Sequence, residues 1–196
     1  MAWAVSLLFS GILLGLQAKE STLPDLISNT RTTIDDVDGK PRNPFQAENA
    51  KASVLIFVTH DCPISNAYSP ELSRLRNDYE DKGFDMMLVY VDPDVDEAGI
   101  KAHMKDYKLT GYTAIADKTH RLVQAAGATI TPEVAVVIPD GSISYRGRID
   151  NMYPALGQRR RVITEKDLRN ALDAIFENKP IKVSRTQAVG CYVPNL

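Results

Sequence analysis

Two continuous apolar stretches, Ser53–Val58 and Phe84–Val91, dominate the first half of the chain. Both are rich in β-branched, aromatic and aliphatic residues, which is typical of strands buried on both faces of a sheet. Between them, apolar side chains recur every three or four residues over Ala67–Lys82 and predict an amphipathic helix that Gly83 ends. Pro70 lies near the start of this stretch, so a kink or a late helix start is expected there. Strand, helix and strand in this order predict a right-handed parallel βαβ unit.

The rest of the chain continues the alternation of helical and extended patterns. Asp140-Gly141 separates two extended stretches and indicates a tight hairpin turn, and Asp38-Gly39 indicates a turn nearer the N-terminus. The further elements that we predict are helices over Asp96–Lys108 and Lys118–Ala126 and strands over Thr113–Ala116, Glu133–Ile138 and Ser142–Arg148. The periodicity therefore predicts an α/β fold with a mixed sheet.

A last amphipathic pattern predicts a helix that runs to about Asn178. Thr164 and Asp167 have the spacing of a capping box, with Asp in place of the usual Glu, so we expect the helix to open there. The apolar side chains expected on its buried face are Leu168, Leu172 and Phe176. After Pro180 the pattern predicts an irregular tail.

Length and composition fit one globular domain. A chain of 196 residues can bury a sizeable core but is too short to suggest two domains. Its 44% hydrophobic and 24% charged residues are ordinary values. A net charge of −2 with dispersed Lys and Arg argues against nucleic acid or an anionic membrane surface as a partner.

The N-terminal stretch resembles a targeting segment. Ala2–Leu16 is almost entirely apolar, and its length suits the core of a signal peptide better than a membrane span. Because it lacks Lys and Arg, and Leu16 stands where a small residue is preferred, a buried first helix or an uncleaved anchor is the alternative. We expect residues 1–18 to be a signal peptide, 19–178 the domain and 179–196 a tail. Export to the periplasm or exterior, without stable membrane insertion after cleavage, would allow a disulfide to persist.

Cys62 falls where the first buried strand passes into the following helix. The unpaired N–H groups and dipole of a helix N-terminus favour an anion, so a thiol placed there ionises readily. Pro63 suits the first helical turn, where its missing N–H would have no helical partner. We therefore expect Cys62 to be an ionised and accessible thiol. The alternative is a buried structural thiol or half of a static disulfide.

The surrounding residues resemble the active-site stretch of thioredoxin-like redoxins. The matching pattern is Phe57-x-Thr59-x-x-Cys62-Pro63, and the group includes the peroxiredoxins (AhpC/TSA) and periplasmic thiol–disulfide proteins. Cys62–Asn66 also resembles a set of exported bacterial redoxin-domain proteins. The resemblance covers roughly Ile34–Phe176 and implies a thioredoxin fold, a single domain with a mixed central sheet flanked by helices. It also implies that Cys62 is the nucleophile and that Thr59 hydrogen-bonds its thiolate.

Thr131-Pro132 carries a second resemblance. In thioredoxin-like proteins a cis-proline preceded by a small residue packs beside the active-site cysteine, so the resemblance implies that Pro132 is cis and close to Cys62. The Thr131 backbone could then hydrogen-bond an extended partner as an added strand. The alternative is an ordinary trans proline at the start of an edge strand.

The sequence departs from the family pattern at three positions. Ser65 stands where dithiol members carry the second cysteine of Cys-x-x-Cys, so no local thiol can release a captured substrate. Leu55 stands where peroxiredoxins carry a proline, and Pro132 where they carry an arginine that stabilises the thiolate. Arg146 or Arg148 could supply that charge from elsewhere in the fold.

Cys191 is the second cysteine, and its context Thr186–Cys191 looks like the C-terminal segment of the same exported set. Three roles are open to it. It could resolve an oxidised Cys62, because a sulfenic acid condenses with a nearby thiol. It could form a static bridge, which would stabilise the fold by up to roughly 5 kcal/mol. It could also be an unpaired surface thiol. A mobile tail would suit the first role.

His60 has two candidate roles. As a cation it would lower the pKa of Cys62, while Asp61 would oppose that effect. With Cys62 and Cys191 it could instead hold a soft metal such as copper. Surface or helix-cap positions are expected for the other two histidines, His103 and His120.

The sequence thus predicts an exported thiol-dependent oxidoreductase. Cys62 would attack a peroxide or a disulfide, Cys191 or an external thiol would resolve the product, and a reducing thiol protein would restore the enzyme. No cofactor or metal is expected. The candidate site residues are Cys62, Thr59, Pro132, Thr131 and Cys191. The alternative is a non-catalytic thioredoxin-fold binding module or a copper-handling chaperone.

Overall fold

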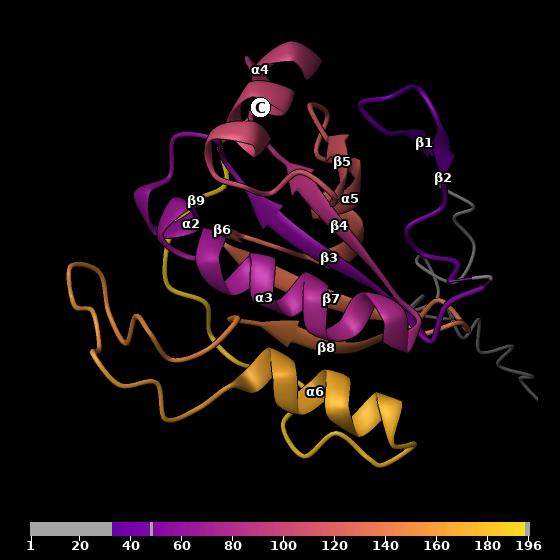
Figure 1. The fold of residues 1–196 in the computed structure, drawn as a ribbon, viewed down its shortest axis with the longest axis vertical. Helices are drawn as coiled ribbons and strands as arrows, with labels where there is room; N and C mark the ends of the chain where they lie inside the picture. The colour runs from indigo at the N-terminus through magenta and orange to yellow at the C-terminus, as the bar shows by residue number, and fades with distance from the viewer. Residues whose placement is uncertain (1–32, 48, 195–196) are drawn as a thin grey trace, which may run out of the picture.

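A mixed sheet of five strands, in the order β5-β4-β3-β7-β8, forms the centre of the molecule (Figure 1). The central strand β3 is buried at every residue and pairs in parallel with β4 and antiparallel with β7. The strands are β3 (Ala52–Val58), β4 (Phe84–Tyr90), β5 (Thr113–Ala116), β7 (Glu133–Val137) and β8 (Ile143–Gly147). The predicted α/β fold with a mixed sheet and the βαβ unit are confirmed.

The computed structural model describes residues 33–47 and 49–194. Two short strands, β1 (Ile34–Asp35) and β2 (Pro41–Arg42), form the hairpin expected around Asp38-Gly39. The expected signal peptide, residues 1–18, lies outside the described residues. Among the residues that are described, none of the helices has the length and apolarity needed to cross a membrane.

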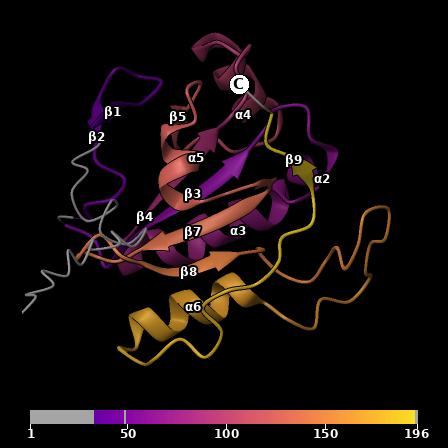
Figure 2. The ribbon, with the colours of Figure 1, turned by 180° about the vertical axis from the view of Figure 1, so that it is seen from behind.

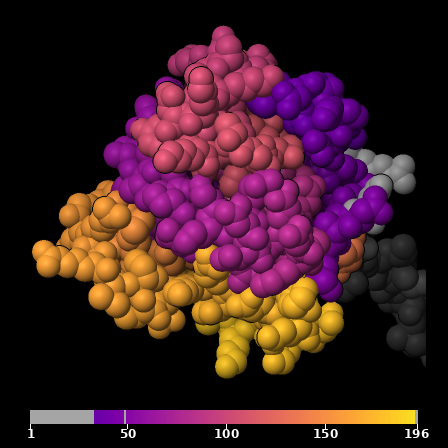
Figure 3. Space-filling view, viewed as in Figure 1, coloured from indigo at the N-terminus to yellow at the C-terminus, as the bar shows by residue number. Residues whose placement is uncertain are grey.

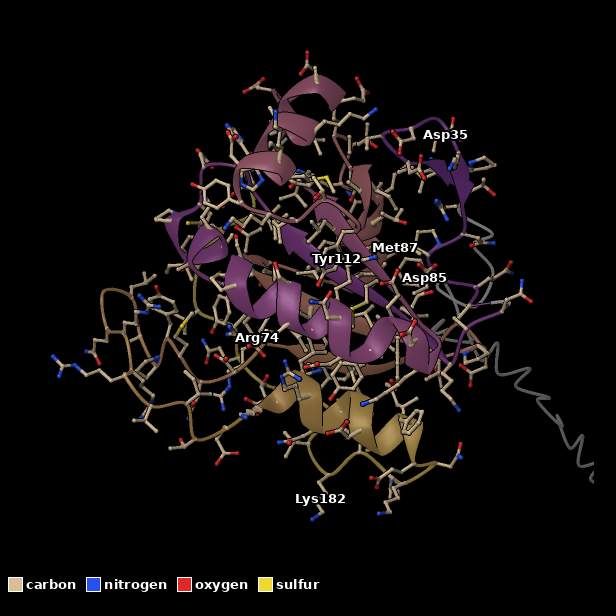
Figure 4. The ribbon with its side chains drawn as sticks, in the orientation of Figure 1. Asp35, Arg74, Asp85, Met87, Tyr112 and Lys182 are labelled. Atoms are coloured by element: carbon tan, nitrogen blue, oxygen red, sulfur yellow. The ribbon has the colours of Figure 1, made fainter. Side chains whose placement is uncertain are left out.

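Helices cover both faces of the sheet because successive side chains of β3 point to opposite sides. One face packs against α3 (Ser69–Tyr79), α4 (Glu97–Asp106) and α6 (Asp167–Phe176), and the other against α5 (Arg121–Ala126) (Figures 1 and 2). The long connection between β8 and α6 bulges from the surface (Figure 3). Lys182, beyond the end of α6, projects away from the body of the molecule (Figure 4).

The predicted kink near Pro70 is confirmed. Helix α2 (Pro63–Ala67) ends at Tyr68, and α3 begins at the next residue with Pro70 in its first turn. The 3-10 turn η1 (Glu80–Lys82) then leads to Gly83, whose φ of 85° gives the chain a left-handed end to the helix. The kink lets α2 start at Cys62 while α3 lies along the sheet.

The start of α6 differs from the prediction. Lys166 is the N-cap residue, without a side-chain capping bond, and the helix begins at Asp167. Thr164 does not cap it, because its hydroxyl accepts a hydrogen bond from the Asn151 amide at 2.7 Å. Phe176 was expected to be buried but is 40% exposed, since it lies at the last turn of the helix, beyond the edge of the core.

Helix α5 is shorter than predicted. Lys118 to His120 form a turn, and His120 has a left-handed φ of 56° that excludes it from the helix. The Asp117 carboxylate caps the helix instead and accepts hydrogen bonds from the N–H groups of Arg121, Leu122 and Val123. A surface position was one of the two expected for His120. The residue is buried instead, and its Nε2 donates to the Val91 carbonyl at 2.9 Å.

The C-terminal tail is mostly irregular, as predicted, but it includes a short strand that the pattern does not predict. After α6 it runs beside β8, where Arg146 N–H donates to the Ser184 carbonyl and Thr186 N–H donates to the Arg146 carbonyl. Its strand β9 (Cys191–Tyr192), labelled in Figure 2, pairs antiparallel with β6 (Ile130–Thr131). Backbone pairing fixes this segment, and such pairing leaves little trace in side-chain periodicity.

Buried hydrogen bonds from the Tyr68 hydroxyl to Asp150 help to hold the junction between α2 and α3, and the shorter of them reaches Oδ1 at 2.8 Å. We predict that Tyr68→Phe lowers the free energy of unfolding by about 1–3 kcal/mol, because the buried Asp150 oxygen loses one of its two donors and keeps only the Met152 N–H at 2.8 Å. Denaturant unfolding followed by circular dichroism measures the change.

Tyr153→Phe is the matched control. Tyr153 packs 6.0 Å from the Tyr68 ring, is partly exposed, and its hydroxyl makes no hydrogen bond to a described residue. Its loss should change stability by no more than about 0.5 kcal/mol. Equal losses in the two variants would contradict the role given to the Tyr68 hydroxyl.

Candidate active site

Cys62 lies at the end of the central strand, as the N-cap residue of α2. Its sulfur accepts a hydrogen bond from the Ser65 N–H at 3.4 Å, in the way that a capping oxygen would. Pro63 occupies the first helical turn, as expected. The predicted position of the thiol at a helix N-terminus is confirmed.

Pro132 lies beside Cys62 because β7 runs antiparallel to β3. The register pairs Phe57 near the end of β3 with Glu133 at the start of β7, so the residue before β7 reaches the active-site end of the sheet. The Thr131-Pro132 peptide bond is cis, as the resemblance implied. The Thr131 carbonyl accepts a hydrogen bond from the Cys62 thiol at 3.4 Å, which joins the two motifs directly.

Thr59 is buried at the same place but does not make the expected bond. Its hydroxyl lies 3.5 Å from the Thr131 hydroxyl, and its carbonyl accepts the Cys62 N–H at 3.4 Å. Among the described contacts, none joins the Thr59 hydroxyl to the Cys62 sulfur. In this arrangement Thr59 therefore positions the backbone of Cys62 and the side chain of Thr131.

The two cysteines are free thiols that meet across the end of the sheet. Burial raises the pKa of Cys62, but the neighbouring Cys191 thiol, the Ser65 hydroxyl and the Ser65 N–H, which donates to the sulfur at 3.4 Å, outweigh it and hold that pKa below its usual range. The pKa of Cys191 is raised to about 12 by burial, by its hydrogen bond to Cys62 and by the charges of Cys62 and Asp61. The pair is therefore asymmetric: Cys62 loses its proton more readily than Cys191 does.

Cys62 is only 1% exposed, which corrects the expectation of an accessible thiol. Strand β9 lies across Thr131 and places Cys191 against the sulfur, so the chain's own tail contributes to the cover. The atoms around the sulfur are hydrogen-bonding groups of Thr131, Ser65 and Cys191. A buried structural thiol in apolar surroundings does not describe this environment.

Arg146 and Arg148 do not supply a charge at the sulfur. Arg146 forms an ion pair with Glu133 at 3.3 Å and donates to the Ala126 carbonyl, while Arg148 pairs with Asp167 at 2.8 Å. In the described part of the chain, neither guanidinium is among the groups that change the pKa of Cys62. The expectation that one of them replaces the peroxiredoxin arginine is wrong.

His60 is paired with Asp92. Its Nδ1 lies 2.7 Å from the Asp92 carboxylate, which also accepts the His60 N–H. Within residues 33–194 apart from residue 48, the three side chains that could share a cation are His60, Asp61 and Asp92, and neither cysteine belongs to this group. The structure therefore does not form the His60, Cys62 and Cys191 metal set. His103 is half-buried and donates to Asn66 at the end of α2.

Ser65 and the tail strand are the parts of the site that sequence reasoning missed. The Ser65 hydroxyl is buried without a hydrogen-bond partner among the described residues, and it lies beside the Cys62 sulfur, whose pKa it lowers. A signal for Ser65 was present, because the third helical residue after an N-cap directs its N–H at the capping atom. The pairing of Cys191 with Thr131 had no such signal.

Comparisons with known proteins agree with this fold. A family model described as Redoxin matches residues 18–158. A hypothetical protein from Sinorhizobium meliloti has a TM-score of 0.71 at 21% identity, covering 84% of this chain and 90% of its own. An uncharacterized conserved protein from Geobacillus kaustophilus has a TM-score of 0.71 at 23% identity, covering 85% and 90%.

A third solved structure has a more informative description. The thioredoxin domain of a thiol-disulfide oxidoreductase from Bacteroides vulgatus has a TM-score of 0.54 at 20% identity, covering 74% of this chain and 92% of its own. No curated protein matches the sequence. At these identities the solved structures establish the thioredoxin-like fold alone.

The asymmetry of the pair predicts a two-step titration. The first proton should leave below the ordinary cysteine pKa, because hydrogen bonds stabilise the Cys62 thiolate, and the second only near pH 12. Ser65→Ala should move the first midpoint upward, since one donor to the thiolate is lost. The ultraviolet absorbance of thiolate, followed against pH, measures both midpoints.

Ser73→Ala serves as the control. Its hydroxyl lies on α3 and donates to the Ser69 carbonyl at 3.0 Å, away from the sulfur. The first midpoint should be unchanged in this variant. If Ser65→Ala also leaves it at the wild-type pH, the Ser65 hydroxyl has no part in stabilising the thiolate.

Proposed function

The chain belongs to the Redoxin family of thioredoxin-like thiol oxidoreductases, and from this we propose that it carries out thiol–disulfide exchange with Cys62 as nucleophile and Cys191 as resolving thiol. The observation that supports this most is the placement of the two cysteines at Thr131, which pairs with Cys191 and whose carbonyl lies 3.4 Å from the Cys62 sulfur. In this pair the pKa of Cys62 is lowered and that of Cys191 is raised to about 12. Nucleophile and resolving thiol need these opposite protonation states at the start of a cycle.

The first step is attack of the Cys62 thiolate on one sulfur of a partner disulfide. The partner's S–S bond breaks, a bond between Cys62 and that sulfur forms, and the other partner sulfur leaves as a thiolate. Ser65 and the N-terminus of α2 hold the attacking sulfur ionised until this step. The Thr131 carbonyl and N–H form the backbone edge along which an extended partner could pair.

The second step releases the partner. The Cys191 thiol transfers its proton to the departing sulfur and attacks Cys62, so that a Cys62–Cys191 disulfide forms and the partner leaves with two thiols. The partner gains two electrons and the cysteine pair loses them. A reducing thiol protein then restores the pair by the same exchange in reverse. Because Ser65 cannot perform this step, Cys191 takes the place of the second cysteine of a Cys-x-x-Cys motif.

Peroxide reduction is the neighbouring possibility, and disulfide exchange is the better supported of the two. A peroxide would need a positive group at the sulfur to stabilise the attacked oxygens, and Arg146 and Arg148 are engaged elsewhere. The backbone edge at Thr131 suits a polypeptide. Copper handling lacks support because His60 is bound to Asp92 and, among the described residues, neither cysteine belongs to the group of side chains that could share a cation with it.

Export completes the proposal. The apolar, uncharged stretch Ala2–Leu16 has the length of a signal-peptide core, and an oxidising compartment would supply disulfide-bonded partners. Periplasmic or extracellular localisation of the natural protein, established by cell fractionation, would support it. Retention in the cytoplasm would overturn it.

We predict that Cys191→Ser traps the partner. With a disulfide-bonded peptide, wild type should end as a Cys62–Cys191 disulfide and release two peptide thiols, whereas Cys191→Ser should hold one peptide on Cys62. Its release should be about a thousandfold slower at micromolar external thiol, because a tethered thiol acts at an effective concentration on the order of millimolar. Intact-mass spectrometry of quenched samples measures each species.

Cys62→Ser is the control and should form no adduct. Hydrogen peroxide in place of the peptide separates the two chemistries, since fast disulfide formation with peroxide alone would favour a peroxidase. Absence of any adduct or disulfide with either oxidant would leave a binding module as the function.

A further inference from the structure

Strand β9 occupies the backbone edge that the proposed reaction needs. Cys191 pairs with Thr131 and Tyr192 with Ile130, and the Val193 N–H extends the ladder to the Thr129 carbonyl at 3.0 Å. The Thr131 hydroxyl also donates to the Cys191 carbonyl at 3.5 Å. A backbone edge can pair with one strand at a time, so a partner strand and β9 cannot bind Thr131 together.

Gly190 shows how closely the tail approaches this edge. A Cβ atom at Gly190 would overlap the carbonyl oxygen of Thr131 and press on the Ile130 side chain. Its φ lies outside the left-handed region, so the backbone conformation alone does not require glycine. Glycine is needed there because two backbones meet without room for a side chain.

The tail is anchored separately from β9. The Thr186 hydroxyl accepts a hydrogen bond from the Arg148 N–H at 3.0 Å and lies 2.8 Å from the Tyr145 hydroxyl. By contrast, β9 has only two residues, and the Tyr192 side chain is 79% exposed. The anchor can hold the tail in place while the short strand leaves and returns.

There is also space for a partner beside the strand. A hollow of about 430 Å³ opens there, lined by residues of β6, of the tail and of the loop after β8. Leu156 on its rim is 65% exposed and offers an apolar contact. Side chains that flank a bound cysteine could rest in this hollow.

We infer that β9 occupies the binding site of the redox partner and mimics the partner's backbone. The partner is an extended polypeptide whose reactive cysteine directly follows a glycine, and it binds by displacing β9 from Ile130 and Thr131. This rests on the proposed function, since it names the partner of the same Cys62. The register that opposes Cys191 to Thr131 would place the partner's cysteine at the Cys62 sulfur. The close approach at Gly190 would then exclude partners with any side chain at the preceding position.

The test uses two peptide disulfides and the full chain. One is the homodimer of the chain's own segment Thr-Gln-Ala-Val-Gly-Cys-Tyr-Val-Pro, and the other has Ala in place of Gly. In the Cys191→Ser chain, which traps adducts, the glycine peptide should form the Cys62 mixed disulfide at least about tenfold faster, the factor expected for one overpacked methyl group. Equal rates for the two peptides would overturn the inference.

A second measurement compares adduct formation in variants that weaken the attachment of the tail. Gly190→Ala, made in the same Cys191→Ser chain, should weaken β9 pairing and speed adduct formation with the glycine peptide by about tenfold. Thr186→Ala, which removes the anchor, should act in the same direction. Val183→Ala, at an exposed tail position, should have no effect. Unchanged rates in both Gly190→Ala and Thr186→Ala would show that β9 does not limit access.

Reaction with a small thiol reagent distinguishes failure of the proposed function from failure of the inference about the partner. If Cys62 in Gly190→Ala does not react even with iodoacetamide at neutral pH, the thiolate itself is absent and the proposed function fails. If it reacts with iodoacetamide but ignores the peptide sequence and the tail variants, only the inference about the partner fails. Circular dichroism confirms that each variant is folded before rates are compared.

Discussion

The site depends on one constraint, the confinement of the Cys62 sulfur between a helix N-terminus and the carbonyl of Thr131. The helix N-terminus contributes the Ser65 N–H, which donates to the sulfur at 3.4 Å and favours the thiolate. The Thr131 carbonyl accepts a hydrogen bond from the protonated thiol, also at 3.4 Å. These two neighbours favour opposite protonation states. The Cys191 thiol and Ser65 hydroxyl shift the balance toward the thiolate. The core fixes this geometry, because β3 and β7 are buried and paired up to the residues that enter the site.

Much of this could be predicted from the sequence, for a physical reason. The apolar run of β3 and the periodicity of α3 are local patterns, and the strand-to-helix passage places Cys62 at an N-terminus without further information. The cis bond at Pro132 could be predicted only from the resemblance to known redoxins, because a proline in a sequence does not by itself indicate whether its peptide bond is cis or trans. Its position beside Cys62 then follows from the register of two buried strands.

What could not be predicted depends on contacts between distant residues. The pairing of Cys191 with Thr131 uses backbone groups that every residue carries, so neither segment has a sequence pattern that predicts it. Arg146 and Arg148 were open candidates until the positions of Glu133 and Asp167 were known. Thr164 has the spacing of a capping residue, but its hydroxyl accepts a hydrogen bond from the Asn151 amide on the preceding loop instead. In each case a residue distant in the sequence decides the outcome, and the local pattern alone does not reveal it.

The two outer strands of the sheet are closed by separate pieces of chain. The Val37 N–H binds the Ala114 carbonyl of β5, and Ser184 to Thr186 pair with Arg146 of β8. Unprotected edges of this kind recruit other molecules and lead to aggregation. Because the segment that shields β8 precedes β9 in the chain, β9 can detach without exposing that edge. A redox cycle with a moving tail is therefore compatible with a protein that stays dispersed at high concentration.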